Sequence, residues 1–427
     1  MTPGQQRGAS VATEQSGCPD SLAPPPLSKE AALAQLLAAV RPLDEVETIP
    51  TDQGLGRVLA RALTSAIAVP GWDNSAMDGY AVRCADLAAG PARLRVTQRI
   101  PAGTLGQPLE PRTAARIFTG APIPTGADAV VIQEYCTRDA DWVEVPGHPT
   151  RGANIRRTGE DICVGTEVIA PGTRLRPQHL GLAASVGATQ LSVYRRLRVT
   201  MFASGDELVM PGEPLGPGQI YNSNRFTLKG LLVGLGCEVS DLGQVPDTLK
   251  ATMAALARAA AGADLILGSG GVSVGEEDHV KPAIERLGTL DLWNVAIRPG
   301  KPLAFGHVHG TPFLGTPGNP VSLFVTFLVF ARPLVLRMQG VTGDLEPPAL
   351  KVRADFDVPR PDRRREFQRA RLTRGTDGEW EAVVYASRSP GVLSSAAWAD
   401  GLVEIPAGQT VARGDPVIYI PFGGLLS

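Results

Sequence analysis

The chain has 427 residues, and its 41 Lys and Arg against 43 Asp and Glu argue against a dominant nucleic-acid binder or a polybasic membrane binder. The length suggests about three domains and is enough to bury several hydrophobic cores without disulfides. Its 48 glycines and 37 prolines predict a globular protein with many tight loops.

The five cysteines are odd in number, lie far apart and form no Cys-x-x-Cys motif. We therefore expect neither a disulfide framework nor a thiolate zinc site, and a reducing cytoplasm fits best. The longest apolar stretch, 321–331, ends at Arg332 and is shorter than the roughly 20 residues that span a bilayer. The first residues lack the apolar core of a secretory signal.

The N-terminal part predicts a polar leader, one helix and a β-rich domain. Residues 1–26 are polar, end in three prolines and are expected to be disordered. A helix is predicted over 29–40, because Ser28 can cap it and apolar residues recur with helical spacing. From 70 to 150, short apolar runs such as 129–132 and 142–145 alternate with Pro and Gly turns. Residues 151–195 return to mixed structure.

From about 197 to 340 the pattern alternates between strand and helix. Strands are expected at 197–203, 237–242 and 264–267, and helices at 224–235, 249–260 and from about 278. This βαβαβ order predicts a parallel sheet with helices on both faces, whose ligands bind outside the C-terminal ends of the strands. From about 346 onwards, spaced strands predict a small β-barrel or sandwich at 351–358, 366–372, 381–386, 402–405 and 417–420.

Two turns in the α/β segment could bind an anion. The glycine-rich run 268–275 follows a buried strand, and closely spaced glycines let backbone N–H groups approach a phosphate. A tight strand-to-helix turn explains it equally well. In Thr316-Pro317-Gly318-Asn319-Pro320, Asn319 suits an N-cap and Pro320 a first helical turn, so structural capping accounts for both. The functional alternative is a second anion-binding helix start.

Charged residues beside turns could bind an oxyanion or a metal. Arg298 and Lys301, held in a Pro-Gly turn, suit an oxyanion, although a solvated surface turn is the alternative. Oxygen ligands without His or Cys clusters fit Mg²⁺, but each acid alone is explained as a cap or turn former; they are Asp78, Glu160, Asp161, Asp206, Glu207, Asp247 and Asp278. His307 and His309 indicate a hairpin end more than a zinc site.

Together these stretches resemble the molybdopterin molybdenumtransferase family, bacterial enzymes of molybdenum-cofactor assembly related to the E domain of gephyrin. The resemblance runs from about residue 27 to the C-terminus, and its motifs occur in the family's order. They are 70–82 (PGWDNSAMDGYAV), 117–122 (IFTGAP), 154–161 (NIRRTGED), 204–208 (SGDEL), 268–275 (GSGGVSVG), 299–302 (PGKP) and 317–322 (PGNPVS).

The resemblance implies a multidomain α/β fold and a homodimer. It places a discontinuous, elongated dimerisation domain at 27–70 and 151–196, a β-rich insert at 71–150, a molybdopterin-binding α/β domain at 197–341 and a C-terminal β-barrel at 346–427. The site would lie between the α/β domain of one chain and the insert of the other. Asp78, Thr119 and Asp161 would then face Glu207, Asp247 and Asp278 across the two subunits.

The implied reaction inserts molybdate into adenylylated molybdopterin and releases AMP with Mg²⁺, after an upstream molybdopterin adenylyltransferase has made the substrate. The catalytic residues carried over are Asp78, Thr119, Asp161, Glu207, Asp247, Asp278 and Lys301, with Glu207, Asp247 and Asp278 as metal ligands. The molybdopterin or phosphate contacts are Ser204, Gly205, Ser269, Gly270, Gly271, Ser273, Gly275, Pro317, Gly318, Asn319 and Pro320. The molybdate contacts are Arg298, Lys301, Arg369 and Ser389.

The sequence departs from the family pattern at a few of these positions. Arg298 stands where the family usually has Lys, Thr316 replaces a common Leu, and Asp247 is one acid where many members have two. Ser389 would replace a serine displaced by Pro390. Two other functions stay open: adenylylation of molybdopterin with ATP, and a dimeric scaffold that binds a partner peptide. Tungstate, nearly isosteric with molybdate, would be attracted by the same cations.

Overall fold

The computed structural model describes residues 26–271, 279–300 and 302–425. Helix α1 (Lys29–Ala38) begins as predicted, since the Ser28 hydroxyl accepts a hydrogen bond from the Ala31 N–H at 3.1 Å, and ends two residues earlier. Segments on either side of the β-rich insert then pair with each other. β1 (Val46–Pro50) pairs with β12 (Gln190–Tyr194), and β2 (Leu63–Thr64) with β11 (Glu167–Ile169), all antiparallel.

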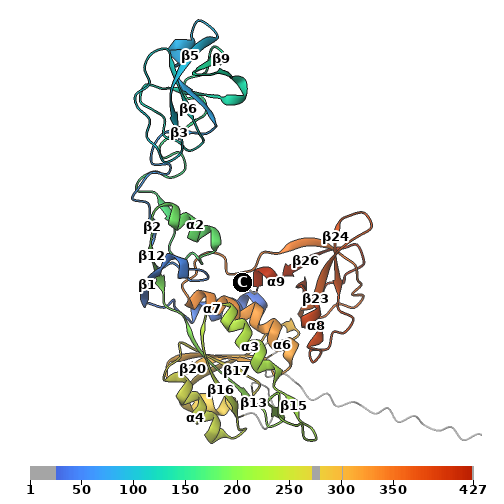
Figure 1. Cartoon of the computed structure of the whole chain (residues 1–427). Coiled ribbons are helices and arrows are strands. Elements are labelled where there is room, and N and C mark those ends of the chain that lie inside the picture. Colours follow the sequence, from blue (N-terminus) through green and yellow to red (C-terminus); the bar gives the residue numbers. More distant parts are fainter. Residues whose placement is uncertain (1–25, 272–278, 301, 426–427) are drawn as a thin grey trace, which may run out of the picture.

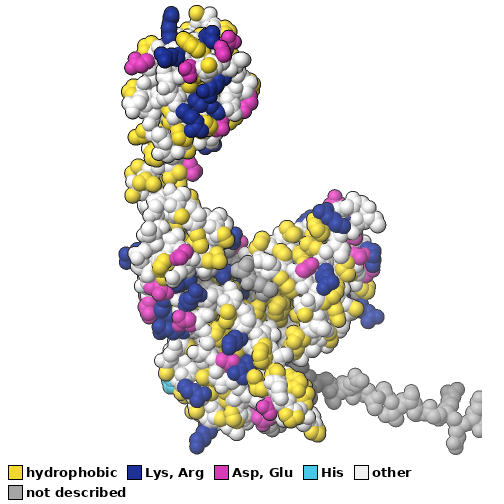
Figure 2. Space-filling model, in the orientation of Figure 1, with side chains coloured by type: hydrophobic (Ala, Val, Ile, Leu, Met, Phe, Trp, Pro, Cys, Tyr) yellow, Lys and Arg dark blue, Asp and Glu magenta, His cyan; other side chains and the backbone are white. Residues whose placement is uncertain are grey.

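The β-rich insert forms a separate lobe at one end of the molecule (Figure 1). Its six-stranded sheet has the order β7-β4-β6-β5-β9-β8, and the predicted runs 129–132 and 142–145 are confirmed as β7 and β9. Figure 2 shows the surface narrowing to a neck below this lobe. The strands are β4 (Gly79–Val82), β5 (Ala92–Ile100), β6 (Thr113–Ile117), β7 (Ala129–Ile132), β8 (Thr137–Asp139) and β9 (Trp142–Val145), with β3 (Asn74–Ser75) pairing β10 (Ile155–Arg156) beside them.

The α/β segment is built on a mixed six-stranded sheet of order β16-β13-β17-β21-β20-β18. β13 (Arg198–Ser204), β16 (Glu238–Val245), β17 (Leu265–Ser269) and β21 (Thr311–Thr316) are parallel neighbours, as predicted. The prediction of a parallel sheet is wrong for one strand: β20 (Pro302–Val308) runs antiparallel to both of its neighbours, β21 and the edge strand β18 (Gly288–Asn294). The reason is the two-residue turn His309-Gly310, with positive φ at both residues, which closes a hairpin. The hairpin predicted at the two histidines is thereby confirmed.

Helices cover both faces of this sheet, as predicted. One face packs against α1, α3 (Ser223–Gly234) and the helix that begins at Pro320, around side chains such as Val199 and Leu267. The other face packs against α4 (Leu249–Ala260) and α5 (Val280–Leu287), around Phe202 and Ile266. The parallel strand pair β14 (Leu208–Val209) and β15 (Ile220–Tyr221) leads into α3.

The long helix over Pro320–Met338 is the centre of the hydrophobic core. It comprises α6 (Pro320–Thr326), a π-helical stretch (Phe327–Ala331) and α7 (Arg332–Met338). Its 19 residues and mean hydropathy of 1.8 would allow it to cross a membrane, but 89% of its most apolar stretch is buried inside the protein. The apolar stretch of the sequence ends at Arg332, but the helix continues to Met338. The Arg332 side chain is buried and donates to the carbonyl oxygens of Leu345, Gly424 and Leu425.

The C-terminal segment closes into a β-barrel, the first of the two predicted alternatives. The sheet has the order β19-β23-β24-β22-β26-β25, and an additional β23–β25 pairing closes the ring. β19 (Ile297–Arg298) belongs to the α/β segment and pairs with β23, so it joins the two units. The remaining bounds are β22 (Leu350–Ala354), β23 (Arg365–Arg374), β24 (Trp380–Val384), β25 (Gly401–Ile405), β26 (Pro416–Pro421), α8 (Ser394–Trp398), α9 (Phe422–Leu425), α2 (Pro177–Ser185) and the 3-10 turns Thr51–Gln53, Cys84–Leu87 and Gln133–Tyr135.

Phe330 lies at the middle of the central helix with no solvent exposure. We expect Phe330→Ala to lower the free energy of unfolding by about 3–5 kcal/mol, because it removes a buried ring and leaves a cavity. Urea unfolding followed by hydrogen exchange of β13 and β17 would measure this. Phe226→Ala is the control: Phe226 is 55% exposed on α3, so its loss should change stability by about 0.5 kcal/mol or less. Equal effects would contradict this account of the core.

Candidate functional site

The C-terminal ends of four parallel strands meet in register at one edge of the α/β sheet. Ser204 of β13 pairs with Val245 of β16, Ala203 with Ser269 of β17, and Ser269 with Thr316 of β21. The loops that leave these strands therefore start side by side. They are the stretches 205–207, 246–247, 270–271 and 317–320, which sequence reasoning had singled out separately.

Three carboxylates gather in the loops after β13 and β16. The Ser204 hydroxyl lies 3.2 Å from Asp247 Oδ1, and the Asp247 N–H donates to Asp206 Oδ1 at 3.3 Å. The Glu207 side chain folds over Gly205, where a Cβ would come within 2.5 Å of Glu207 Oε2. Gly205 has a φ of +145°, so a side chain there would also strain the backbone.

None of these three carboxylates has a Lys, Arg or His partner within 4 Å among the described residues. The described residues also contain no group of three or more His, Cys, Asp or Glu side chains arranged to hold a metal ion. The predicted third ligand, Asp278, lies outside them, as do Ser273, Gly275 and Lys301. What the structure does place together is an oxygen-only donor set, the kind that Mg²⁺ prefers.

The two predicted anion-binding turns lie against each other. The Gly270 N–H donates to the Thr316 carbonyl oxygen at 3.1 Å, and a Cβ on Gly318 would be 3.8 Å from Gly270 Cα. Gly270 has a φ of +81°, and a Cβ there would lie 2.7 Å from the Ser204 carbonyl oxygen, so only glycine fits comfortably. Asn319 occupies the N-cap position of α6, but its side chain makes no capping hydrogen bond.

Asn224, at the start of α3, holds the two turns together and was missed by sequence reasoning. Its Nδ2 donates to Ser269 Oγ at 3.1 Å and to the Gly318 carbonyl oxygen at 2.7 Å. Its Oδ1 is buried and has no hydrogen-bond partner among the residues that the structure describes. The signal was the pair of asparagines at 222 and 224, of which Asn222 caps α3 by accepting from the Arg225 N–H.

The barrel contributes a loop to the same edge. The Val321 N–H, in the first turn of α6, donates to the Pro390 carbonyl oxygen at 3.0 Å. A Cβ on Gly300 would lie within 4 Å of Pro317 and Ser322, which brings the predicted oxyanion turn here as well. The start of α6 therefore lies between the turn after β19 and the barrel loop 387–391.

The predicted arginines at this junction are held by acids and carbonyls. Arg298 lies 3.0 Å from Asp362, and Arg298 and Arg388 approach the buried Glu366 at 3.9 and 3.6 Å. Arg369 is buried, and it donates to Ser395 Oγ at 2.9 Å and to the Ser387 and Ser389 carbonyl oxygens at 2.7 and 3.4 Å. Burial lowers the pKa of its guanidinium. Arg369 thus fixes the loop that carries Ser389.

The acids of the β-rich lobe form a separate group. Asp78 Oδ1 accepts hydrogen bonds from the N–H and the hydroxyl of Thr119, both at 2.8 Å. Asp161 lies in a turn, and its own N–H donates to the Val69 carbonyl oxygen. Within one chain, this lobe stands at the far end from the α/β sheet (Figure 1). The structure of one chain therefore does not bring these three residues to Glu207.

The two hydrogen bonds from Thr119 lower the pKa of Asp78, and the backbone bond has the larger effect. We expect Thr119→Val to move this pKa up toward its ordinary value, because the hydroxyl donor is lost while the N–H remains. Carbon-13 NMR titration of labelled aspartate carboxyls would measure the shift. Thr104→Val, at an exposed threonine of the same lobe, should leave the pKa of Asp78 unchanged; a similar rise in both variants would contradict the assignment.

Comparisons with known proteins cover almost the whole chain. Three family models match in order: the MoeA N-terminal region (domains I and II) over 27–187, a probable molybdopterin binding domain over 200–337, and the MoeA C-terminal region (domain IV) over 351–422. The molybdopterin molybdenumtransferase of Haemophilus influenzae is 39% identical over 90% of this chain and 95% of its own length. Molybdopterin molybdenumtransferase 2 of Mycobacterium tuberculosis is 39% identical over 88% of this chain and 93% of its own.

The fold agrees with solved structures as well. A molybdopterin biosynthesis MoeA protein from Pyrococcus horikoshii superimposes with a TM-score of 0.79 at 28% identity, covering 93% of this chain and all of that one. A second structure of that name has a TM-score of 0.74 at 31% identity and covers 99% of its own chain. The resemblance seen in the sequence motifs is thereby confirmed, and this chain belongs to the MoeA family of molybdopterin molybdenumtransferases.

Proposed function

We propose that this protein is a molybdopterin molybdenumtransferase that inserts molybdate into adenylylated molybdopterin and releases AMP in the presence of Mg²⁺. One observation carries the proposal: the carboxylates after β13 and β16, the glycine turns after β17 and β21, and the barrel loop 387–391 that Arg369 holds adjoin one sheet edge. These groups suit a substrate in which phosphates are attached to a pterin, and the pterin takes up the oxyanion. An upstream adenylyltransferase in the cytoplasm would supply that substrate.

The phosphates would bind at the paired glycine turns. Gly270, Gly271 and Gly318 let backbone N–H groups approach an anion, and the N-terminus of the central helix adds a positive dipole. Asn224 fixes the spacing of the two turns by its bonds to Ser269 and Gly318. Ser204 and Gly205 border the same space from β13. This arrangement would hold the substrate without covalent chemistry, so positioning would account for much of the rate.

Glu207, Asp247 and Asp278 would hold Mg²⁺. The first two fit the ion, because their carboxylates are free of cationic partners within 4 Å in the described part of the chain, and Mg²⁺ typically takes one or two carboxylates and keeps several waters. When bound, the ion would neutralise charge on the phosphoanhydride. Ser204 and Asp206 orient Asp247 from both sides.

Molybdate would bind where the barrel meets the start of the central helix. Arg298, Lys301 and Ser389 would contact the oxyanion. Arg369 would act mainly as a positioning residue, since its donors hold the carbonyl oxygens of Ser387 and Ser389. Arg388, which shares Glu366 with Arg298, adds a second cation that the sequence did not single out.

Asp78, Thr119 and Asp161 would complete the site from a second subunit. They lie on the distant lobe of their own chain and at the neck below it (Figure 2), so the α/β sheet that they would complete is that of a second copy of the chain. We therefore propose a homodimer in which each site combines the α/β sheet of one protomer with the lobe of its partner. In a two-fold symmetric dimer this exchange creates two equal sites.

Glu207→Gln should lower turnover about 100-fold or more, because removing one charge that stabilises the transition state costs about 2.7–4 kcal/mol. Release of AMP from adenylylated molybdopterin with molybdate and Mg²⁺ would be measured. Glu213→Gln, an exposed glutamate in the loop after β14, is the matched control and should keep full activity. Loss of ATP without molybdate would instead identify an adenylyltransferase. Full activity of Glu207→Gln would sink the proposed site.

The proposed dimer predicts complementation between two inactive variants. Asp161→Asn disables the lobe and Glu207→Gln disables the sheet edge, so a mixed dimer contains one intact site. After exchange of subunits at equal amounts, activity should recover to about a quarter of the wild-type value, since half of the dimers would be mixed. Two variants of the same side, Glu207→Gln and Asp247→Asn, should not complement each other. Recovery in neither mixture would place each site within a single chain.

A further inference from the structure

A large cavity lies at the opposite end of the α/β sheet from the candidate site. It has a volume of about 810 Å³, and Gly234, after which α3 ends, and Arg196, two residues before β13, both line it. β13 has seven residues, so its two ends are roughly 20 Å apart at about 3.3 Å per residue. The cavity is therefore a separate site from the turns at Ser204 and Ser269.

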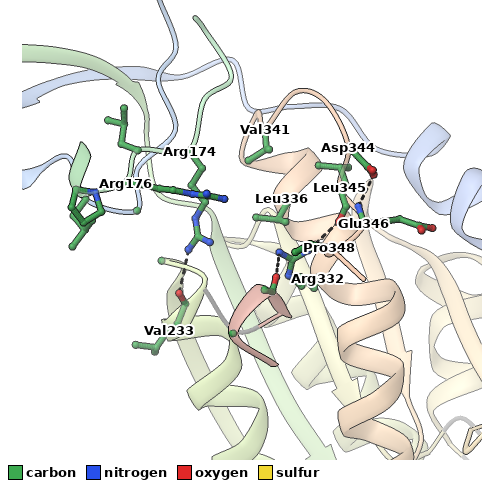
Figure 3. A pocket seen from close by; sticks show the side chains of 18 of the residues that line it. Arg174, Arg176, Val233, Arg332, Leu336, Val341, Asp344, Leu345, Glu346 and Pro348 are labelled. Carbon is green, nitrogen blue, oxygen red and sulfur yellow. Dashed lines mark hydrogen bonds between the residues drawn. The ribbon is translucent and has the colours of Figure 1, made fainter. Parts of the chain in front are cut away.

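Four arginines line this cavity: Arg174, Arg176, Arg196 and Arg332. Arg174 and Arg176 reach in from the segment before α2, and Arg332 lies across from them on α7 (Figure 3). None of the four forms an ion pair within 4 Å among the described residues. Burial lowers the pKa of Arg174, and the nearby charge of Arg176 lowers it further. Positive charge is thus crowded here, and no described acid pairs with these arginines.

Part of this charge has a structural role. Arg332 donates all of its bonds to carbonyl oxygens, Arg196 donates to the Gly236 carbonyl at 3.0 Å, and Arg174 donates to the Gly234 carbonyl at 3.3 Å. The bonds of Arg174 and Arg196 satisfy carbonyls at the end of α3, but donors remain unused. Among the described residues, the buried Arg174 Nε has no hydrogen-bond partner and the Arg176 guanidinium makes no hydrogen bond.

Two acids at the rim do not cancel this charge. Glu346 pairs with Lys29 at 3.3 Å, and Asp344 Oδ1 accepts the Glu346 N–H at 2.9 Å within its own turn. The N-terminus of α2, a helix of nine residues that begins at Pro177, opens into the same space. Its dipole adds to the attraction for a negative ligand. Leu55, Val233 and Leu336 supply an apolar wall.

We propose that this cavity binds a phosphate-bearing small molecule. Arginine forks match phosphate oxygens in pairs, and a phosphate carries enough negative charge to offset the excess of two cations over acids. The volume is within the range of small-molecule sites, and the apolar wall fits an organic body attached to the phosphate. Arg174 and Arg176 would bond the phosphate oxygens directly. Arg332, whose donors are bonded to carbonyl oxygens, would add positive charge without direct contact.

Hydrogen exchange and calorimetry on the full chain, with sodium pyrophosphate or ATP as the probe, test this inference. Either probe should slow exchange in the segments 174–180 and 341–346. Arg176→Ala should weaken binding at this site about tenfold, whereas Arg258→Ala, at an exposed arginine of α4, should not. Binding of pyrophosphate would show that phosphates alone are sufficient for binding at this site. Binding of ATP but not of pyrophosphate would show that the apolar wall contributes to the affinity as well.

Three results would overturn the inference. The first is that neither probe protects either segment from exchange. The second is that a probe protects the Arg176→Ala variant as well as the wild type. The third is that both segments are already protected without a probe and lose that protection on dilution to monomers. The last result would mean that a second copy of the chain covers the cavity. Because protection of 204–210 and 316–323 reports on the candidate site independently, failure here leaves the proposed function untouched.

Discussion

Ser204, Ser269 and Thr316 lie beside one another because β13, β17 and β21 are parallel and paired in a fixed register. A shift of one residue in any of these strands would turn its side chains to the opposite face of the sheet. Phe202 would then leave the core on the α4 side, and Met201 would leave the core on the α3 side. Burial on both faces therefore sets the register, and the register places the loops that carry the acids and glycines.

The barrel is joined to this sheet firmly, while the β-rich lobe is not. β19 pairs with β23, the start of α6 is bonded to the barrel loop at Pro390, and Arg332 ties the central helix to Gly424 and Leu425. These contacts fix the barrel loop 387–391 against the start of the central helix. The lobe instead hangs on a neck formed by the segments near Val69 and Ile162 (Figure 1). A site shared between two subunits requires one part that is fixed within its own chain, here the sheet and barrel, and one part that extends toward the partner, here the lobe.

Much of this fold could be predicted from local patterns. The helix at 249–260 has the bounds expected from its period, and the strands at 129–132 and 142–145 were placed correctly because turn residues flank them. The hairpin turn at the two histidines was predicted, but β18, β20 and β21 were not assigned from the sequence, and a buried strand looks alike in either direction. The burial of Arg332 could not be predicted either, because its carbonyl partners come from the distant residues 345, 424 and 425.

The candidate site was predictable only in part, for the same physical reason. Glycines, prolines and acids at strand ends can be recognised from the local sequence. The role of Asn224 depends instead on its contacts with residues 45 and 94 positions away. The arginine-lined cavity is an extreme case, because its walls come from six separate stretches of chain. Parallel strands give a sheet two chemically different ends. At one end, loops and the start of the central helix offer N–H groups. At the other end, the carbonyl oxygens around the end of α3 accept hydrogen bonds from arginines, and the positive charge of these arginines exceeds what the carbonyl dipoles neutralise.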